Sequence, residues 1–444
     1  MPTATPTRHA LRASLLWFDA DPTRDPNATR YLDDGVLVIE NGKIIATHAW
    51  HELSTRDLRA LALTDLRGQL ILPGFIDTHI HFPQTEMIAA YGEQLLEWLN
   101  QYTFPVERRF ANAEYARLRA SFFVDELLRN GTTTAMVFAT VHPQSVEALF
   151  SEAAARQMCL IAGKVMMDRH APEDLLDTPE QGLSESRALI ERWHQHGRLL
   201  YAVTPRFAPT STPAQLAAAG QLLREYPDLY LQTHLSENHS EIAWVRELYP
   251  ERASYLDVYD HYGLTGPRSL FAHAIHLQDD EQQTLVRTGS AVGFCPTSNL
   301  FLGSGLFRLH PLKAAGIGVG LGTDVGAGTS FSMLQTLNEG YKVQQLQGAR
   351  LSAREGFYQA TLGGASALRL DHRLGKLAAS YDADLVVLDW AATPLQQLRQ
   401  SQARTLDERL FALMMQGDDR NVAATYVHGR CVYQGPALSQ ARSA

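Results

Sequence analysis

Residues 73–81 read PGFIDTHIH, an apolar strand that runs into two histidines separated by one residue. Side chains at positions i and i+2 of a strand point to the same side, so His79 and His81 can direct two imidazoles at one point. Taken alone, this pair is weak evidence in a chain with 17 histidines. Histidine is the commonest metal ligand, so the positions of the other histidines decide the interpretation.

Short apolar runs alternate with helical patterns through the middle of the chain. The eight predicted strands are residues 70–77, 132–138, 159–167, 200–206, 230–234, 270–276, 291–294 and 318–324. The helical patterns are residues 144–156, 184–196, 213–225, 279–287 and 332–346. This alternation predicts a parallel sheet, and eight units over ~300 residues fit a (β/α)₈ TIM-like barrel. The rival is a doubly wound open sheet, but the chain lacks the dinucleotide fingerprint of that fold.

Both ends of the chain are rich in short strands. The N-terminal part carries the hairpin pattern 35–46 around Asn41-Gly42, and the C-terminal part carries strand patterns at 383–388 and 424–433. Two strand-rich ends predict one small β-sandwich domain formed by both termini, with two unrelated end caps as the alternative. The predicted domain organisation is therefore as follows: residues 1–69 and 373–444 form the small β domain, and residues 70–372 form the barrel.

The composition excludes several classes of protein. The net charge of −9 argues against a nucleic-acid surface, which needs a basic patch. Three cysteines cannot form a disulfide framework and suit a reducing compartment. The sequence has no run of ~18 apolar residues, which a membrane-spanning helix would need. Residues 1–19 do not resemble a signal peptide. We therefore expect a cytoplasmic enzyme with no nucleic-acid or membrane partner.

Four histidines and an aspartate fall at or near the ends of predicted barrel strands. His79 and His81 follow the first strand, His234 ends the fifth, His273 lies in the sixth, and Asp324 ends the eighth. Functional residues of such barrels gather at the carboxyl ends of the strands. Three imidazoles and a carboxylate suit Zn²⁺ or another divalent transition ion, which can lower the pKa of a bound water.

Glu237 lies three residues after His234, just past the same strand. This position suits proton exchange with a metal-bound water, although a lone glutamate after a strand is more often a solvated loop residue. Trp98 and Tyr102 are four residues apart on a predicted helix, where pairing in the core is the default and a lid over the site is the alternative.

The residues 73–81 together with His234, His273 and Asp324 resemble the pattern of the amidohydrolase superfamily, over about residues 70–370. Residues 95–105 read LLEWLNQYTFP and residues 204–207 read TPRF. These segments are similar to those that guanine deaminases, in the mononuclear-metal branch of the superfamily, place around their purine. The resemblance implies a homodimer and hydrolysis of guanine to xanthine and ammonia, through attack of zinc-bound hydroxide at C2.

The resemblance also implies a ligand set. His79, His81, His234 and Asp324 would hold one Zn²⁺ per subunit, with Fe²⁺ as the alternative. His273 would orient the metal-bound water, and both His273 and Asp324 would take part in catalysis.

The remaining implied roles concern the proton and the base. Glu237 would shuttle the proton. Gln84, Arg206 and Phe207 would bind the base together with His234 and Glu237. Arg206 offers donors for the O6 carbonyl, Phe207 can pack on the purine face, and Gln84 suits a heterocycle edge.

One departure from binuclear relatives favours a single metal. Those enzymes use a carbamylated lysine at the end of strand four, where this chain has Arg206, which stays protonated. Lys164 lies before the end of strand three and is interpreted as a structural or supporting residue.

Two alternatives to guanine deamination stay open. The same scaffold could deaminate another amino-heterocycle, such as a pterin, an oxidised purine, a triazine or a cytosine-like base. A non-catalytic assembly protein is the other alternative, but such relatives lose metal ligands. Cys295 is interpreted as a packing residue, and His276 is either a supporting residue of the site or unrelated to it. Eight histidines are assigned to the surface or to packing: His142, His170, His194, His196, His261, His310, His372 and His428.

Overall fold

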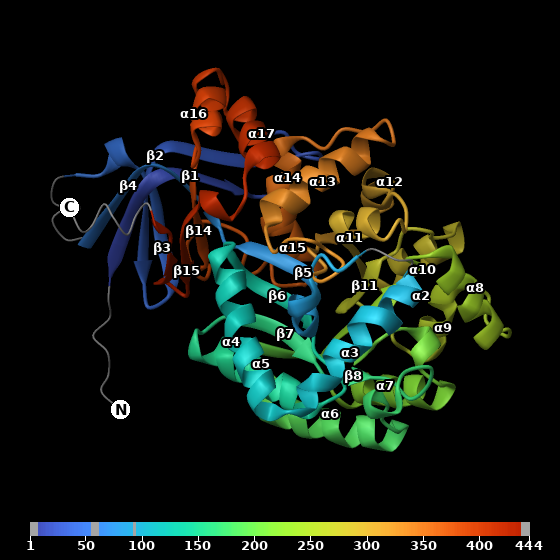
Figure 1. The fold of residues 1–444 in the computed structure, drawn as a ribbon. Coiled ribbons are helices and arrows are strands. Elements are labelled where there is room, and N and C mark those ends of the chain that lie inside the picture. Colours follow the sequence, from blue (N-terminus) through green and yellow to red (C-terminus); the bar gives the residue numbers. More distant parts are fainter. Residues whose placement is uncertain (1–7, 55–61, 92–94, 437–444) are drawn as a thin grey trace.

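The protein is described from a computed structural model that covers residues 8–54, 62–91 and 95–436 (Figure 1). Parts of the predicted terminal domain ranges, residues 1–7, 55–61 and 437–444, lie outside the described residues. Within the described part of the chain, no helix is both long and apolar enough to cross a membrane.

Eight parallel strands form the barrel, as predicted. They are β5 (Phe75–His81), β6 (Thr132–Phe138), β7 (Cys159–Gly163), β9 (Leu199–Pro205), β10 (Tyr230–Leu235), β11 (Ser269–His273), β12 (Ala291–Phe294) and β13 (Gly318–Leu321). The short strand β8 (Val165–Met166) pairs only with β9. Two backbone hydrogen bonds join β5 to the segment after β13: Asp324 N donates to His79 O at 2.9 Å, and His81 N donates to Val325 O at 2.8 Å. These bonds close the barrel beside the two histidines.

Most of the helices surround the barrel strands (Figure 1). The helices are α2 (Leu95–Trp98), α3 (Phe104–Glu107), α4 (Ala113–Arg129), α5 (Pro143–Ala155), α6 (Pro179–Trp193), α7 (Pro213–Glu225), α8 (His239–Leu248), α9 (Tyr255–His261), α10 (Asp279–Thr288), α11 (Pro296–Phe301), α12 (Leu309–Ala314), α13 (Met333–Gln345), α14 (Ala353–Tyr358), α15 (Gly364–Ala367), α16 (Pro394–Ser401) and α17 (Leu406–Gln416). Of these, α16 and α17 lie beside a second sheet, where α17 packs on α13 and α14 (Figure 1). Local signals start several of the helices. In α6 and α7, a threonine N-cap precedes a proline at the first helical position, which is the preferred start of a helix.

A second sheet combines strands from both ends of the chain, and Figure 1 shows the blue and red strands side by side. Its order is β16-β15-β14-β4-β1-β2-β3. The strands are β1 (His9–Phe18), β2 (Thr29–Glu40), β3 (Lys43–Ala49), β4 (Ala62–Pro73), β14 (Leu385–Asp389), β15 (Val422–Val427) and β16 (Arg430–Gln434). Side chains from β1, β3 and β15 share one apolar cluster, so the sheet curls around a small core of its own. This sheet confirms the prediction that both termini build one β structure.

The predicted strand at residues 70–77 is wrong in its extent, because the chain changes sheets at Gly74. Residues up to Pro73 belong to β4 and pair with β14, whereas β5 begins at Phe75 and pairs with β6. A Cβ on Gly74 would lie 2.1 Å from Oγ1 of Thr133, so only glycine fits this crossing. The predicted strand 159–167 is also divided, into β7 and β8. The division into domains at residues 69/70 and 372/373 remains a prediction. Strand β4 runs across the first of these two boundaries.

A buried charge cluster ties the second sheet to the barrel. Arg198, directly before β9, donates to Asp384 at 3.0 Å and to Asp382 at 3.2 Å. Arg373 donates to the same Asp382 carboxylate at 2.7 Å, and Lys43 of β3 pairs with it as well. The side chain of Asp382 is fully buried, so its charge depends on these three cations.

Candidate metal centre and active site

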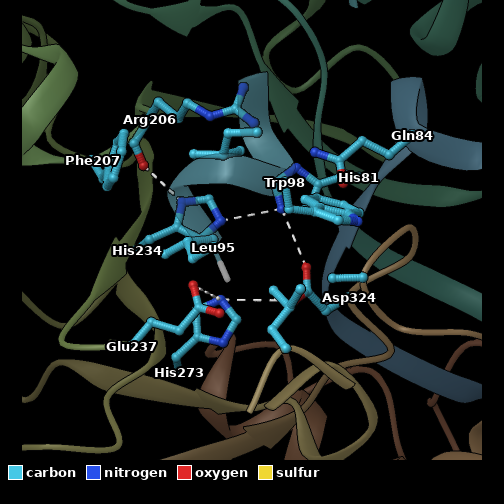
Figure 2. Close-up of a pocket in the computed structure, with 13 residues that line it drawn as sticks. His81, Gln84, Leu95, Trp98, Arg206, Phe207, His234, Glu237, His273 and Asp324 are labelled. Carbon is cyan, nitrogen blue, oxygen red and sulfur yellow. Dashed lines mark hydrogen bonds and ion pairs between the residues drawn. The ribbon is translucent and has the colours of Figure 1, made fainter. Parts of the chain in front are cut away.

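His79, His81, His234 and Asp324 gather at the ends of three barrel strands, and His273 also lies within reach of His79 and Asp324 (Figure 2 labels all but His79). The Nε2 atoms of His79 and His81 lie 3.2 and 3.3 Å from Oδ1 of Asp324. The Nε2 atom of His81 lies 3.2 Å from Nε2 of His234. The period-two spacing of β5 and the closure of the barrel beside Asp324 bring these four side chains together.

The arrangement fits a tetrahedral metal ion. Ligand atoms at about 2.0–2.1 Å from a tetrahedral zinc ion lie roughly 3.3–3.4 Å from one another, and the three observed separations are 3.2–3.3 Å. Both ring nitrogens of His79 are buried and make no hydrogen bond with another described residue. A buried nitrogen without a partner is costly, and a bound cation removes that cost.

Neighbouring groups hold the ligands in a metal-binding state. Burial lowers the pKa of His81 to about 3, and burial and the other histidines lower that of His234 well below its usual range, so both rings are neutral. Although burial opposes it, the neighbouring rings of His79 and His81 hold the pKa of Asp324 well below its ordinary value. Nδ1 of His234 lies 2.7 Å from the carbonyl oxygen of Arg206. This contact leaves Nε2 with its lone pair toward the centre.

Two residues support the centre that the sequence did not single out for a role. Asp77 is fully buried and accepts hydrogen bonds from the hydroxyl of Thr323 at 2.5 Å and from its backbone N–H at 3.1 Å. This carboxylate therefore locks β5 to the segment that carries Asp324. Oδ1 of Asn299 lies 2.9 Å from Nδ1 of His273 and fixes the orientation of that ring.

His273 and Glu237 lie beside the ligand cluster. Nε2 of His273 is 3.7 Å from Asp324 and 3.4 Å from Oε2 of Glu237. The other oxygen of Glu237 accepts a hydrogen bond from the hydroxyl of Ser304 at 3.0 Å. Burial, and next the charge of Asp324, raise the pKa of Glu237 to about 8, so this carboxyl group can take up and release a proton near neutral pH.

Three residues at this site have a strained backbone. His273, Ala274 and Asp324 have φ values of 69°, 48° and 53°, in the left-handed region that non-glycine residues rarely adopt. Such residues cost about 1–3 kcal/mol each and occur most often at functional sites. Here the strain directs the side chains of His273 and Asp324 toward the cluster.

A pocket opens onto this cluster. In Figure 2, Arg206 and Gln84 lie at one end of the pocket, and Glu237 and His273 lie at the other. Phe207 lies beside His234, with ring centroids 6.4 Å apart. The other described residues of the lining are apolar: Leu95, Trp98, Leu99, Leu302 and Ala327.

Residues 95–107 bring further side chains to the pocket. The helices α2 and α3 are joined by one π-helical turn, Leu99–Thr103, and this segment buries Trp98 against the site. Trp98 therefore lines the pocket, as the predicted lid would require, whereas Tyr102 does not line it. Glu107, at the end of α3, is buried and accepts hydrogen bonds from Arg206 and Gln84. No pattern in the sequence indicated that role.

Several other residues lie away from the ligand cluster. Lys164 is buried in an ion pair with Asp177, so it has a structural place, as one interpretation predicted. Cys295 packs in the core, and burial raises the pKa of its thiol well above the usual value. His276 approaches the site only through the carbonyl oxygen of Ser304, 2.8 Å from its Nε2. None of the eight histidines assigned to the surface or to packing lines the pocket.

Comparisons with known proteins agree with this geometry. The model of the amidohydrolase family matches residues 70–432. The guanine deaminase of Escherichia coli K12 is 56% identical over 93% of this chain and 94% of its own length. The solved E. coli guanine deaminase superposes with a TM-score of 0.93 at 55% identity, covering 96% of this chain and 99% of that one. A guanine deaminase structure from C. acetobutylicum with bound guanine superposes with a TM-score of 0.87 at 30% identity, covering 96% and 100%. The chain belongs to the amidohydrolase family, in the branch of the guanine deaminases.

Proposed function

We propose that this chain hydrolyses guanine to xanthine and ammonia at the pocket above the His/Asp cluster. The observation that carries the proposal is the lining of the pocket, which brings Glu237 and three of the four candidate metal ligands together with Arg206 and Gln84. The high identity to guanine deaminases over most of the chain supports the same reaction.

One divalent metal ion, held by His79, His81, His234 and Asp324, is part of the proposal. We assign Zn²⁺, because three imidazoles and one carboxylate suit it, with Fe²⁺ as the alternative. A metal ion in this site lowers the pKa of water and supplies a nucleophile near neutral pH.

Glu237 moves the proton. Its carboxylate accepts a proton from the attacking water and delivers it to N3 of the base, while a C–O bond forms at C2. The proton of the new hydroxyl at C2 then passes to the amino nitrogen, the bond from C2 to that nitrogen breaks, ammonia leaves, and the C2 carbonyl of xanthine remains. His273, 3.4 Å from Glu237 and 3.7 Å from Asp324, is placed to hold the water in line for attack.

The other end of the pocket recognises the base. Arg206 has donors at Nε and Nη2 that make no hydrogen bond with another described residue and can meet the O6 carbonyl. Phe207 and Trp98 provide apolar surface for the purine rings. Adenine carries an amine at C6 and would leave these two donors of Arg206 without an acceptor, at a cost of about 1–3 kcal/mol.

Ammonia release from a panel of amino-heterocycles tests the proposal. The panel contains guanine, adenine, a pterin, an oxidised guanine, an aminotriazine and cytosine, incubated with purified protein of measured metal content. We expect guanine to be the best substrate by kcat/KM. Release from another ring but none from guanine would replace the proposal with a different deaminase. Stoichiometric zinc or iron is expected by elemental analysis, and its absence would favour a non-catalytic protein.

Two further expectations accompany this function. A homodimer is implied by the family resemblance, and sedimentation velocity would show whether it forms. A cytoplasmic location is expected from the composition, and cell fractionation would test it.

A further inference from the structure

Glu107 joins two residues of the base-binding end of the pocket from outside the lining. Its Oε1 and Oε2 accept hydrogen bonds from Nη1 of Arg206 at 3.0 and 2.7 Å. Its Oε1 also accepts one from Nε2 of Gln84 at 3.3 Å. The Glu107 side chain is 1% exposed and does not line the pocket. It therefore acts on the base only through its two partners.

The contacts of Gln84 fix which way its amide points. Nε2 faces the Glu107 carboxylate, which can only accept, and Oε1 accepts from the backbone N–H of Gly326 at 3.3 Å, which can only donate. A flipped amide would lose both contacts. One Nε2 hydrogen is thus committed to Glu107, and the other is available to the heterocycle.

The negative charge of Glu107 affects which ligands the pocket can bind. Among the described residues of the lining, Arg206 is the only one with a guanidinium or ammonium group. Both Arg206 and Glu107 are buried, at 3% and 1% exposure, so solvent screens the guanidinium little. Without the carboxylate, a buried cation would remain at the base-binding end and would attract anions.

We propose that Glu107 is a specificity-determining and positioning residue: it neutralises and orients Arg206, so that the pocket binds neutral 6-oxo heterocycles and rejects their anions. This inference rests on the proposed function. It also concerns the product, because xanthine is a stronger acid than guanine and becomes an anion near neutral pH. Rejection of the anion therefore assists release of the product.

Calorimetric binding of xanthine and hypoxanthine to the metal-loaded protein tests the inference without turnover. Hypoxanthine is a weaker acid than xanthine and stays mainly neutral between about pH 6 and about pH 8, where xanthine already loses a proton in part. In the unmodified protein, the ratio of the Kd of xanthine to that of hypoxanthine should rise about threefold between these two pH values. A flat ratio would overturn the inference, whether or not any variant folds.

Three variants separate charge from packing. Glu107→Gln keeps the shape and removes the charge. In this variant the ratio of the Kd of xanthine to that of hypoxanthine should change less than about twofold with pH. The KM for guanine should rise about tenfold, while kcat stays within about threefold.

Glu107→Asp keeps the charge, so the Kd ratio should still rise with pH as in the unmodified protein. Glu97→Gln removes an exposed carboxylate on α2 and is the matched control. Metal content and Tm are measured for each.

The outcomes distinguish this inference from the proposed function. If guanine is not deaminated while the Kd ratio behaves as expected, the proposed function is wrong and the role of Glu107 stands. If guanine is deaminated while Glu107→Gln keeps the pH-dependent ratio of the unmodified protein, the role of Glu107 is wrong.

Discussion

Ser304 donates a hydrogen bond from its hydroxyl to Oε1 of Glu237 at 3.0 Å, and this contact leaves Oε2 of Glu237 facing His273. One oxygen of the carboxylate is thereby anchored and the other is free for proton transfer. The anchoring residue lies 67 positions away in the chain, in the segment after α11.

Ser304→Ala should lower kcat about tenfold and leave KM nearly unchanged, because Glu237 loses its anchor but the base contacts persist. Steady-state kinetics with guanine would show this split. Ser298→Ala is the matched control, since Ser298 is buried nearby and its hydroxyl makes no hydrogen bond with another described residue. Equal effects of the two substitutions would contradict the proposed anchoring.

Glu237→Gln should retain the metal and lose turnover by a factor of about 10²–10⁴, the usual contribution of a positioned acid or base. The amide keeps the contact with Ser304 but cannot exchange the proton. Elemental analysis and single-turnover kinetics would check both parts. Substantial remaining activity would remove Glu237 from the proton path.

Arg206→Ala should mainly raise the KM for guanine and weaken the preference for purines with a 6-oxo group. The reason is that Arg206 provides the free donors at the base-binding end. The same substitution leaves Glu107 buried without its cation and should lower stability by about 3–5 kcal/mol. Kinetics with guanine and 2-aminopurine, compared below the Tm of the variant, would detect the change. An unchanged substrate preference would mean that another group orients the base.

Removal of the metal with a chelator should abolish activity and lower Tm, because the ion binds the folded chain and not the unfolded one. Readdition of Zn²⁺ should restore both. Because the pKa values of His81 and His234 are lowered, the pH has to fall well below 6 before protons compete with the metal at these rings. Activity that survives exhaustive chelation would contradict the metal site.

Asp382→Asn should destabilise the protein by about 3 kcal/mol at neutral pH, because three cations lose their buried partner. Burial raises the pKa of Asp382, but Arg198, Lys43 and Arg373 together hold it below its usual value. The stabilisation is therefore present above the unfolded pKa of about 3.9 and is lost as pH falls through the lower folded value. Denaturant unfolding at several pH values would show the difference shrinking in acid. Asp407→Asn, at an exposed pair, should cost less than about 1 kcal/mol at any pH.

The ligand cluster was predictable from the sequence because simple rules place it. Strand periodicity aligns His79 with His81, and the barrel architecture brings the ends of β5, β10 and β13 to one face. Glu237 followed from its distance to His234. These predictions needed only local patterns and a fold rule.

The roles of Glu107 and Ser304 could not be predicted from such rules. Each is an ordinary polar residue in a connection, and its partner lies far away in the chain, 99 residues for the pair of Glu107 with Arg206 and 67 for that of Ser304 with Glu237. Only the path of the folded segments shows that they meet. The division at Gly74 was missed for another reason: the run from Leu70 to Ile76 is continuously buried and has no polar side chain, and the Pro73-Gly74 pair was the one local signal of a change of sheet.

The barrel closure between His79 and Asp324 has a consequence for synthesis of the chain. The ligands come from the first, fifth and last barrel strands, so a ribosome must pass residue 324 before all four ligands exist. A nascent or truncated chain that ends earlier has at most the three imidazoles and lacks the strand that shapes their geometry. In the proposed metal site, full metal loading therefore reports that the barrel has been completed, and the metal content of a preparation measures its share of correctly matured protein.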